Sequence, residues 1–148
     1  MKKRNWAKRA TVLLAVAMCI AFGASSAWAA TQVVDGITWT YSVSGGNATV
    51  AGADPTTGAL AIPSTLGGCP VTSIGQDAFS GFSMLTSVTI PDSVTSIGAY
   101  AFSGCTGLAG VTVPDSVKNL EEYAFYGCES LTDATILGNV TNYWNLHA

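Results

Sequence analysis

The chain has 148 residues, of which 49% are hydrophobic and 10% charged, and its net charge is −3. Five of its six basic residues stand within the first nine positions: Lys2, Lys3, Arg4, Lys8 and Arg9. The rest of the chain carries Lys118 against nine carboxylates, which gives 1 − 9 = −8. This balance argues against nucleic acid and anionic membrane surfaces as partners, because both attract clustered Lys and Arg.

Residues 1–29 have the order of a secretory signal peptide. The basic segment is followed by an apolar run of 13 residues, 10–22, and by Ala27-Trp28-Ala29, a small-x-small cleavage pattern. A membrane anchor is the alternative, but such a run is too short to span a bilayer comfortably. We therefore expect a product that begins at Ala30, has no membrane span after cleavage, and is secreted or held at the cell surface.

Residues 30–56 are expected to form an N-terminal β-hairpin cap. Ile37, Trp39, Tyr41 and Val43 alternate with polar residues, and Gly45-Gly46-Asn47 supplies a turn. Trp39 and Tyr41 have two interpretations, an aromatic platform for a sugar or a cover over the first coil of a repeat array. We favour the cover, because the open end of such an array must be sealed.

A repeat of 23 residues runs from Ile74 to Thr141. Six of its 23 columns are identical in all three copies, including the Ala-Phe pair at 78–79, 101–102 and 124–125. A fixed period of this length indicates a solenoid, in which each repeat buries its apolar side against its neighbours. The repeat region is assigned to residues 57–141, with an irregular first coil whose five extra residues fall in 64–70, a loop containing Gly67-Gly68.

Each repeat predicts the same series of local structures. Leu85-x-x-Val88-x-Ile90 ends in an alternation that predicts a strand with one face inward, and Pro91 closes it. The segment 97–102 is long enough for one helical turn, and Gly104 supplies the positive φ needed to leave that turn.

The run I-G-x-x-A-F-x-G-C-x-x-L-x-x-V-x-V-P-x-S-V, at residues 97–117, resembles the BspA-like (Treponema-type) leucine-rich repeat. The resemblance covers roughly two thirds of the chain after residue 29. With the helical turns expected above, it implies a leucine-rich-repeat solenoid of β-rich α/β class, with a parallel concave sheet. It also implies an adhesin-like role at bacterial or protozoan surfaces, binding proteins of a host or partner cell. It transfers no catalytic residue.

The expected binding face consists of the side chains that point outward from the concave sheet. They are Ser87, Thr89, Gly110, Thr112, Asp133 and Thr135. All are small and only Asp133 is charged, so this face lacks the Trp, Tyr and Arg side chains that usually anchor interfaces. The ligand, an extracellular protein or glycan, is therefore implied by the resemblance rather than by these residues.

We expect no enzyme, no cofactor and no metal. The single histidine, His147, stands next to the C-terminus, and no paired C-x-x-C, phosphate loop or dinucleotide fingerprint is present. Glu121-Glu122 stands where a helical turn should begin. Cys105 and Cys128 share a repeat column with Phe82, which favours buried thiols, and a disulfide between adjacent coils is the alternative.

Residues 142–148 are expected to form a tail or cap, because the repeat pattern stops there. The last strand, near 132–136, would keep an unpaired edge, which favours association with another chain. The alternative is that Tyr143, Trp144 and Leu146 fold back over the last coil. Two main functions follow, a surface interaction module or a structural solenoid that self-associates end to end or completes another chain. A secreted hydrolase is a third, weaker reading.

The signal sequence makes the first prediction. N-terminal sequencing of the exported product should begin at Ala30, because the cleavage pattern ends at Ala29. An exported product that still carries Met1 would contradict this assignment.

Overall fold

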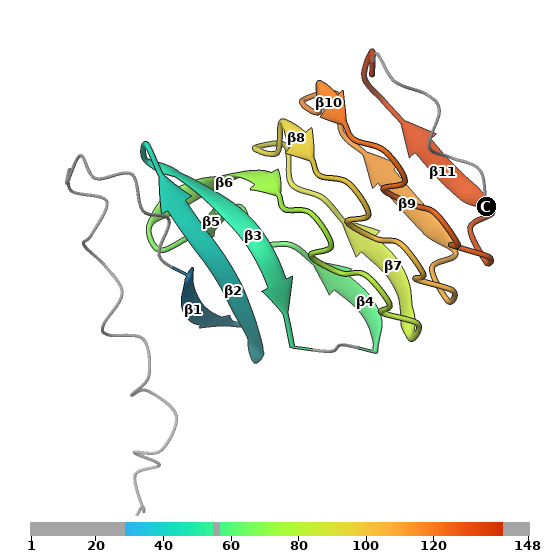
Figure 1. Ribbon diagram of the computed structural model, residues 1–148, viewed down its shortest axis with the longest axis horizontal. Coiled ribbons are helices and arrows are strands. Elements are labelled where there is room, and N and C mark those ends of the chain that lie inside the picture. Colours follow the sequence, from blue (N-terminus) through green and yellow to red (C-terminus); the bar gives the residue numbers. More distant parts are fainter. Residues whose placement is uncertain (1–28, 55–56, 141–148) are drawn as a thin grey trace, which may run out of the picture.

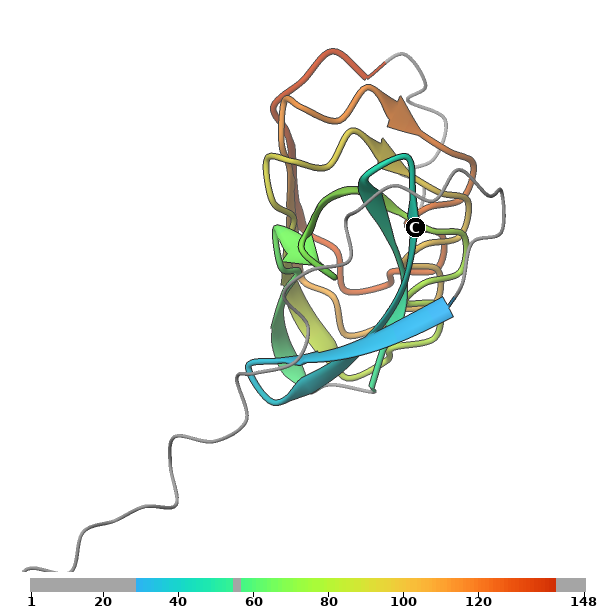
Figure 2. The same ribbon diagram turned by 90° about the vertical axis from the view of Figure 1, so that its left-hand side faces the viewer.

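The structure is a computed structural model that describes residues 29–54 and 57–140. Its regular elements in that part are eleven β-strands, arranged in two main sheets along a stack of coils (Figure 1). The N-terminal strands lie at one end of the stack and β11 (Asp133–Ile136) lies at the other. Seen along the stack, the coils superimpose around a shared interior (Figure 2). The predicted solenoid is therefore confirmed.

The leucine-rich segments form a four-stranded parallel sheet. Its order is β11-β9-β7-β4, with β4 at Gly58–Ala61, β7 at Leu85–Thr89 and β9 at Gly110–Val113. Thr89 pairs with Thr112, and Thr112 pairs with Thr135, so strand neighbours are residues of one repeat column. The 23-residue register read from the sequence is thus the register of the sheet.

The second sheet follows each proline corner. It contains β6 (Cys69–Ile74), β8 (Ser96–Ile97) and β10 (Asn119–Leu120), which pair in parallel through one column, Ile74 with Ile97 and Ile97 with Leu120. At the corners, the Val94 N–H donates to the Pro91 carbonyl at 3.0 Å, and Val117 repeats this bond to Pro114 at 3.2 Å. The prolines end one strand and start the turn that leads to the next.

The N-terminal segment adds three antiparallel strands to this second sheet. They are β1 (Ala29–Val34), β2 (Ile37–Ser44) and β3 (Asn47–Ala53), and β3 pairs in parallel with β6. Asp35-Gly36 and Gly45-Gly46 form the two turns with positive φ, as tight hairpins require. The expected hairpin is present, extended by one strand before it.

The five-residue insertion is not an open loop. Residues Thr65–Leu66 form β5, which pairs back onto β6 through a two-residue turn at Gly67-Gly68. A Cβ on Gly67 would stand 2.8 Å from the ring of Tyr41, and the Gly67 N–H donates to Gln32 Oε1 at 2.8 Å. The insertion therefore packs against the N-terminal strands, where only glycine fits.

The expected helical turns are wrong, because the described residues contain no helix. The N–H groups of Asp77, Phe79 and Gly81 instead donate to carbonyls of the following coil, to Ala99, Ala101 and Ser103, at 2.7–3.0 Å. Donors that bind a neighbouring coil are not available for bonds along a helix. A positive φ at Asp77 (56°) also breaks the helical conformation, and Tyr100 and Tyr123 repeat it at 57°.

A column of phenylalanines fills the interior. Phe79 stacks on Phe102 with ring centroids 5.1 Å apart, and Phe102 stacks on Phe125 at 5.2 Å. Trp39 of β2 meets the free end of this column edge-on, 6.2 Å from Phe79. All four rings are buried, so the core continues from the repeats into the N-terminal strands.

This column generates a stability prediction. Phe102→Ala should lower the free energy of unfolding by about 3–5 kcal/mol, because it removes a ring stacked on both faces. Met84→Ala, at a side chain that is 64% exposed, is the control and should cost less than about 0.5 kcal/mol. Chemical denaturation measures both. Equal unfolding midpoints for the two variants would refute the proposed register.

Candidate binding surface

The six residues of the expected binding face lie together on the outer side of the four-stranded sheet. Thr89, Thr112 and Thr135 form one row across β7, β9 and β11, and Ser87, Gly110 and Asp133 form the adjacent row. Their strand neighbours Val88 and Val111 point inward and are buried. Strand alternation thus places the two rows outward together.

The face offers hydroxyl groups and little else. Thr89, Thr112, Asp133 and Thr135 are exposed, whereas Ser87 and Gly110 are half-buried. Asp133 is the charged member, and its Oδ1 accepts a bond from the Thr135 hydroxyl at 3.5 Å. Small hydroxyl side chains on a flat sheet can hydrogen-bond a polypeptide or a sugar, but they supply no large side chain to fill a partner's pocket.

The N-terminal aromatic residues do not form a sugar platform. Trp39 is 1% exposed and Tyr41 is 6% exposed, so neither ring offers a face to solvent. Trp39 packs against Phe79, and Tyr41 covers Gly67. Of the two interpretations of these rings, the sugar platform is contradicted by their burial.

The structure also contains an aromatic group that the sequence interpretation missed. Tyr100, Tyr123 and Tyr126, here called the tyrosine cluster, lie on the turn side of the coils and are 38%, 45% and 55% exposed. Tyr100 and Tyr123 stack at 5.2 Å, and Tyr126 meets Tyr123 edge-on at 5.7 Å. The signal was available, because Tyr100 and Tyr123 occupy one column immediately before the buried Ala-Phe pair.

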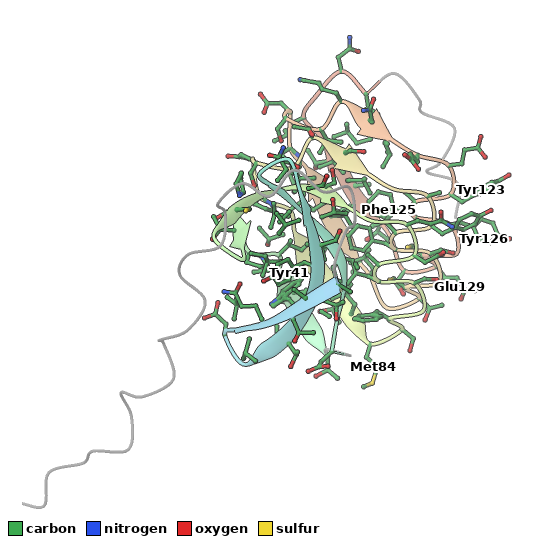
Figure 3. The ribbon with its side chains drawn as sticks, turned by 60° about the vertical axis from the view of Figure 1, so that its left-hand side comes forward. Tyr41, Met84, Tyr123, Phe125, Tyr126 and Glu129 are labelled. Atoms are coloured by element: carbon green, nitrogen blue, oxygen red, sulfur yellow. The ribbon has the colours of Figure 1, made fainter. Side chains whose placement is uncertain are left out.

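Figure 3 shows how the turn side separates inward from outward residues. Phe125 points into the coil, whereas Tyr123, Tyr126 and Glu129 project from its outer edge. Glu121, expected at the start of a helical turn, accepts a hydrogen bond from the Ala99 N–H of the preceding coil at 3.1 Å. Its carboxylate thus joins two coils instead of capping a helix.

Cys105 and Cys128 are free, buried thiols. Each donates to a carbonyl of the preceding coil at 3.2 Å, Cys105 to Phe79 and Cys128 to Phe102. The adjacent Cys128 sulfur, together with burial, raises the pKa of the Cys105 thiol. These contacts match the interpretation of this column as an interior slot and give the thiols a structural role.

The described residues contain neither a metal-binding cluster nor a membrane-spanning helix. Within 29–54 and 57–140, no group of three or more His, Cys, Asp or Glu side chains is arranged to hold a metal ion. The same residues contain no helix long and apolar enough to cross a membrane. The expected signal peptide and the large apolar residues of the tail, Tyr143, Trp144 and Leu146, lie outside this part.

Comparison with known proteins places these features in context. Residues 62–145 match the family described as BspA type leucine rich repeat region (6 copies). No curated protein matches the chain. Among solved structures, a T. pallidum leucine-rich repeat protein is 32% identical with a TM-score of 0.62, over 65% of this chain and 46% of its own.

Two further solved structures are similar. A leucine-rich cell surface protein from Faecalibacterium prausnitzii is 31% identical with a TM-score of 0.60, over 72% of this chain and 31% of its own. A leucine-rich repeat protein from Bacteroides capillosus is 27% identical with a TM-score of 0.53, over 73% of this chain and 99% of its own. The chain thus spans less than half the length of the T. pallidum and F. prausnitzii proteins.

Proposed function

The chain belongs to the BspA-type leucine-rich repeat family, and from this premise we propose that it is an exported, non-catalytic interaction module at the cell surface. Its ligand is an extracellular protein or glycan of a host or partner cell. Two observations support export, the basic, apolar and Ala-x-Ala order of residues 1–29 and the similarity to a cell surface protein of F. prausnitzii.

The binding face is the outer side of the four-stranded sheet. The observation that carries this assignment is the alignment of Thr89, Thr112 and Thr135 in one exposed row, beside Ser87, Gly110 and Asp133. A partner that lies across the strands meets a regular series of hydroxyl donors and acceptors without large side chains in its way. Such a face binds through many small polar contacts rather than through one deep anchor.

The N-terminal strands complete the module as a cap. Their sheet continues the β6-β8-β10 sheet, and Trp39 lies against Phe79, the ring at the N-terminal end of the phenylalanine column. A repeat array needs such a cover because its terminal coil otherwise exposes apolar surface. The cap therefore supports the binding face indirectly, by keeping β4 and β7 folded.

The binding face is tested by a charge placed at its centre. Thr112→Arg should weaken binding to whichever immobilised matrix protein or cell-wall glycan the purified chain recognises, by about 2 kcal/mol or more, as central interface changes do. Thr112 is exposed on β9, so the variant should keep the fold of the chain. Val33→Arg, on the 65% exposed Val33 of β1, is the matched control. An equal loss of binding affinity in both variants, or no loss in Thr112→Arg, would reject this face as the binding site.

End-to-end self-association is a second candidate function. Val88 and Val111 are buried, but β11 has Ala134 in the same repeat column, and Ala134 is exposed. Leu137, just after β11, is 63% exposed. The terminal strand of a sheet is a template for pairing with another strand. This end of the array therefore exposes positions that a coil of a second chain would cover.

Light scattering of the purified chain across concentrations tests this second function. Self-association predicts a mass that rises with concentration and that Ala134→Lys returns to monomer, because an edge lysine opposes strand pairing. Thr112→Arg serves as the control, because it carries the same added charge on the outer face of the sheet. A monomer at every concentration would leave the interaction module as the function.

A further inference from the structure

The tyrosine cluster is the largest concentration of exposed aromatic surface in the described residues. The described residues expose six large hydrophobic side chains, and three of the six are Tyr100, Tyr123 and Tyr126. The other three, Val33, Met84 and Leu137, lie in separate parts of the chain. Clustered exposed tyrosines are typical of interaction surfaces, because each offers a large apolar ring and a hydroxyl group.

The rings stand in a column that the backbone fixes. Asp77, Tyr100 and Tyr123 occupy the same repeat position with φ of 56–57°, and the N–H of each of the first two donates to the following coil at 3.0–3.1 Å. The left-handed conformation suits aspartate and is unusual for tyrosine. The first coil therefore carries a carboxylate at the position where the next two coils carry stacked rings.

The surroundings of the cluster are acidic. Asp77, Glu122 and Glu129 are exposed, and Glu129 projects on the same side as Tyr123 and Tyr126 (Figure 3). Lys118 is the one basic residue of the described segments, and its Nζ donates to the Asp115 carbonyl at 2.6 Å, at a proline corner. The described part of the chain thus supplies no cation of its own to this side.

We propose that the tyrosine cluster and Asp77 bind an arginine side chain of a partner polypeptide. The guanidinium stacks on the face of Tyr100 that is turned away from Tyr123, in the place where a third ring of the column would lie. Its N–H groups donate to the Asp77 carboxylate, and Glu122 and Glu129 add attraction at longer range.

Arginine fits this site better than the alternatives do. The guanidinium is planar, stacks on aromatic rings and forks onto carboxylates, whereas the ammonium of lysine does not stack. A neutral sugar can donate hydroxyl groups to the surrounding carboxylates, but it gains no ionic attraction from them, whereas a guanidinium gains both. A second copy of this chain is a poor source, because its only arginines are Arg4 and Arg9 within the expected signal peptide.

This inference rests on the proposed role as an interaction module, but it uses another side of the coil and adds the chemistry of a partner. The probe is a blocked pentapeptide with one arginine between glycines, titrated into the purified chain and followed by NMR. Counterparts with lysine or citrulline in place of arginine separate guanidinium stacking and charge from shape. Citrulline keeps the length and planarity of arginine and removes its charge.

We expect the arginine peptide to bind about tenfold more tightly than the citrulline peptide, and high salt to weaken its binding. Tyr100→Asn and Asp77→Asn should each weaken it several-fold, and both keep a residue type that tolerates the left-handed conformation. Val33→Ala, at an exposed position of β1 outside both proposed surfaces, is the matched control and should leave binding unchanged. Backbone NMR spectra verify that each variant is folded.

Equal binding of arginine and citrulline peptides, or an unchanged affinity in folded Tyr100→Asn, overturns the proposal. Binding of the lysine peptide as tight as that of the arginine peptide overturns the stacking geometry. Binding of neutral oligosaccharides that is lost in Tyr100→Asn assigns the cluster to a glycan instead. The two proposals fail separately. Loss of ligand binding in Thr112→Arg tests the sheet face alone, and the peptide titration tests the cluster alone.

Discussion

Backbone hydrogen bonds between successive coils are the constraint on which this structure depends. They link the strands of both sheets, and on the turn side they link Asp77 to Ala99 and Phe79 to Ala101. Because these bonds run along the stack, each residue lies beside its counterpart one repeat away. A single geometric rule therefore produces the buried phenylalanine column, the paired thiols, the threonine row and the stacked tyrosines.

Most of the architecture was predictable because it depends on period and alternation. The 23-residue spacing gave the sheet register, and the inward columns gave the core around Phe102. The helical turns were not predictable, because local helix patterns assume that N–H groups bond within their own segment. The β5 strand was also missed, since two residues carry no alternation and only the Gly67-Gly68 pair marked a turn.

The candidate surfaces show the same division. The outward placement of the six predicted residues follows from strand alternation, so it could be read from the sequence. The direction of Tyr100 and Tyr123 depends on a left-handed backbone within a turn, which alternation does not encode. The stack therefore has a sheet side of small, mostly hydroxyl side chains and a turn side with exposed tyrosines and carboxylates, and a strand pattern reveals only the first.

The Tyr41 ring over Gly67 has a consequence for how the array is counted. The regular repeats share their columns, so these columns do not distinguish one coil from the next as the place where the N-terminal strands pack. The Gly67-Gly68 turn occurs in one coil of the described repeats, and a Cβ on its Gly67 would lie 2.8 Å from the Tyr41 ring. The N-terminal strands thus pack on the first coil through a feature that the later repeats lack.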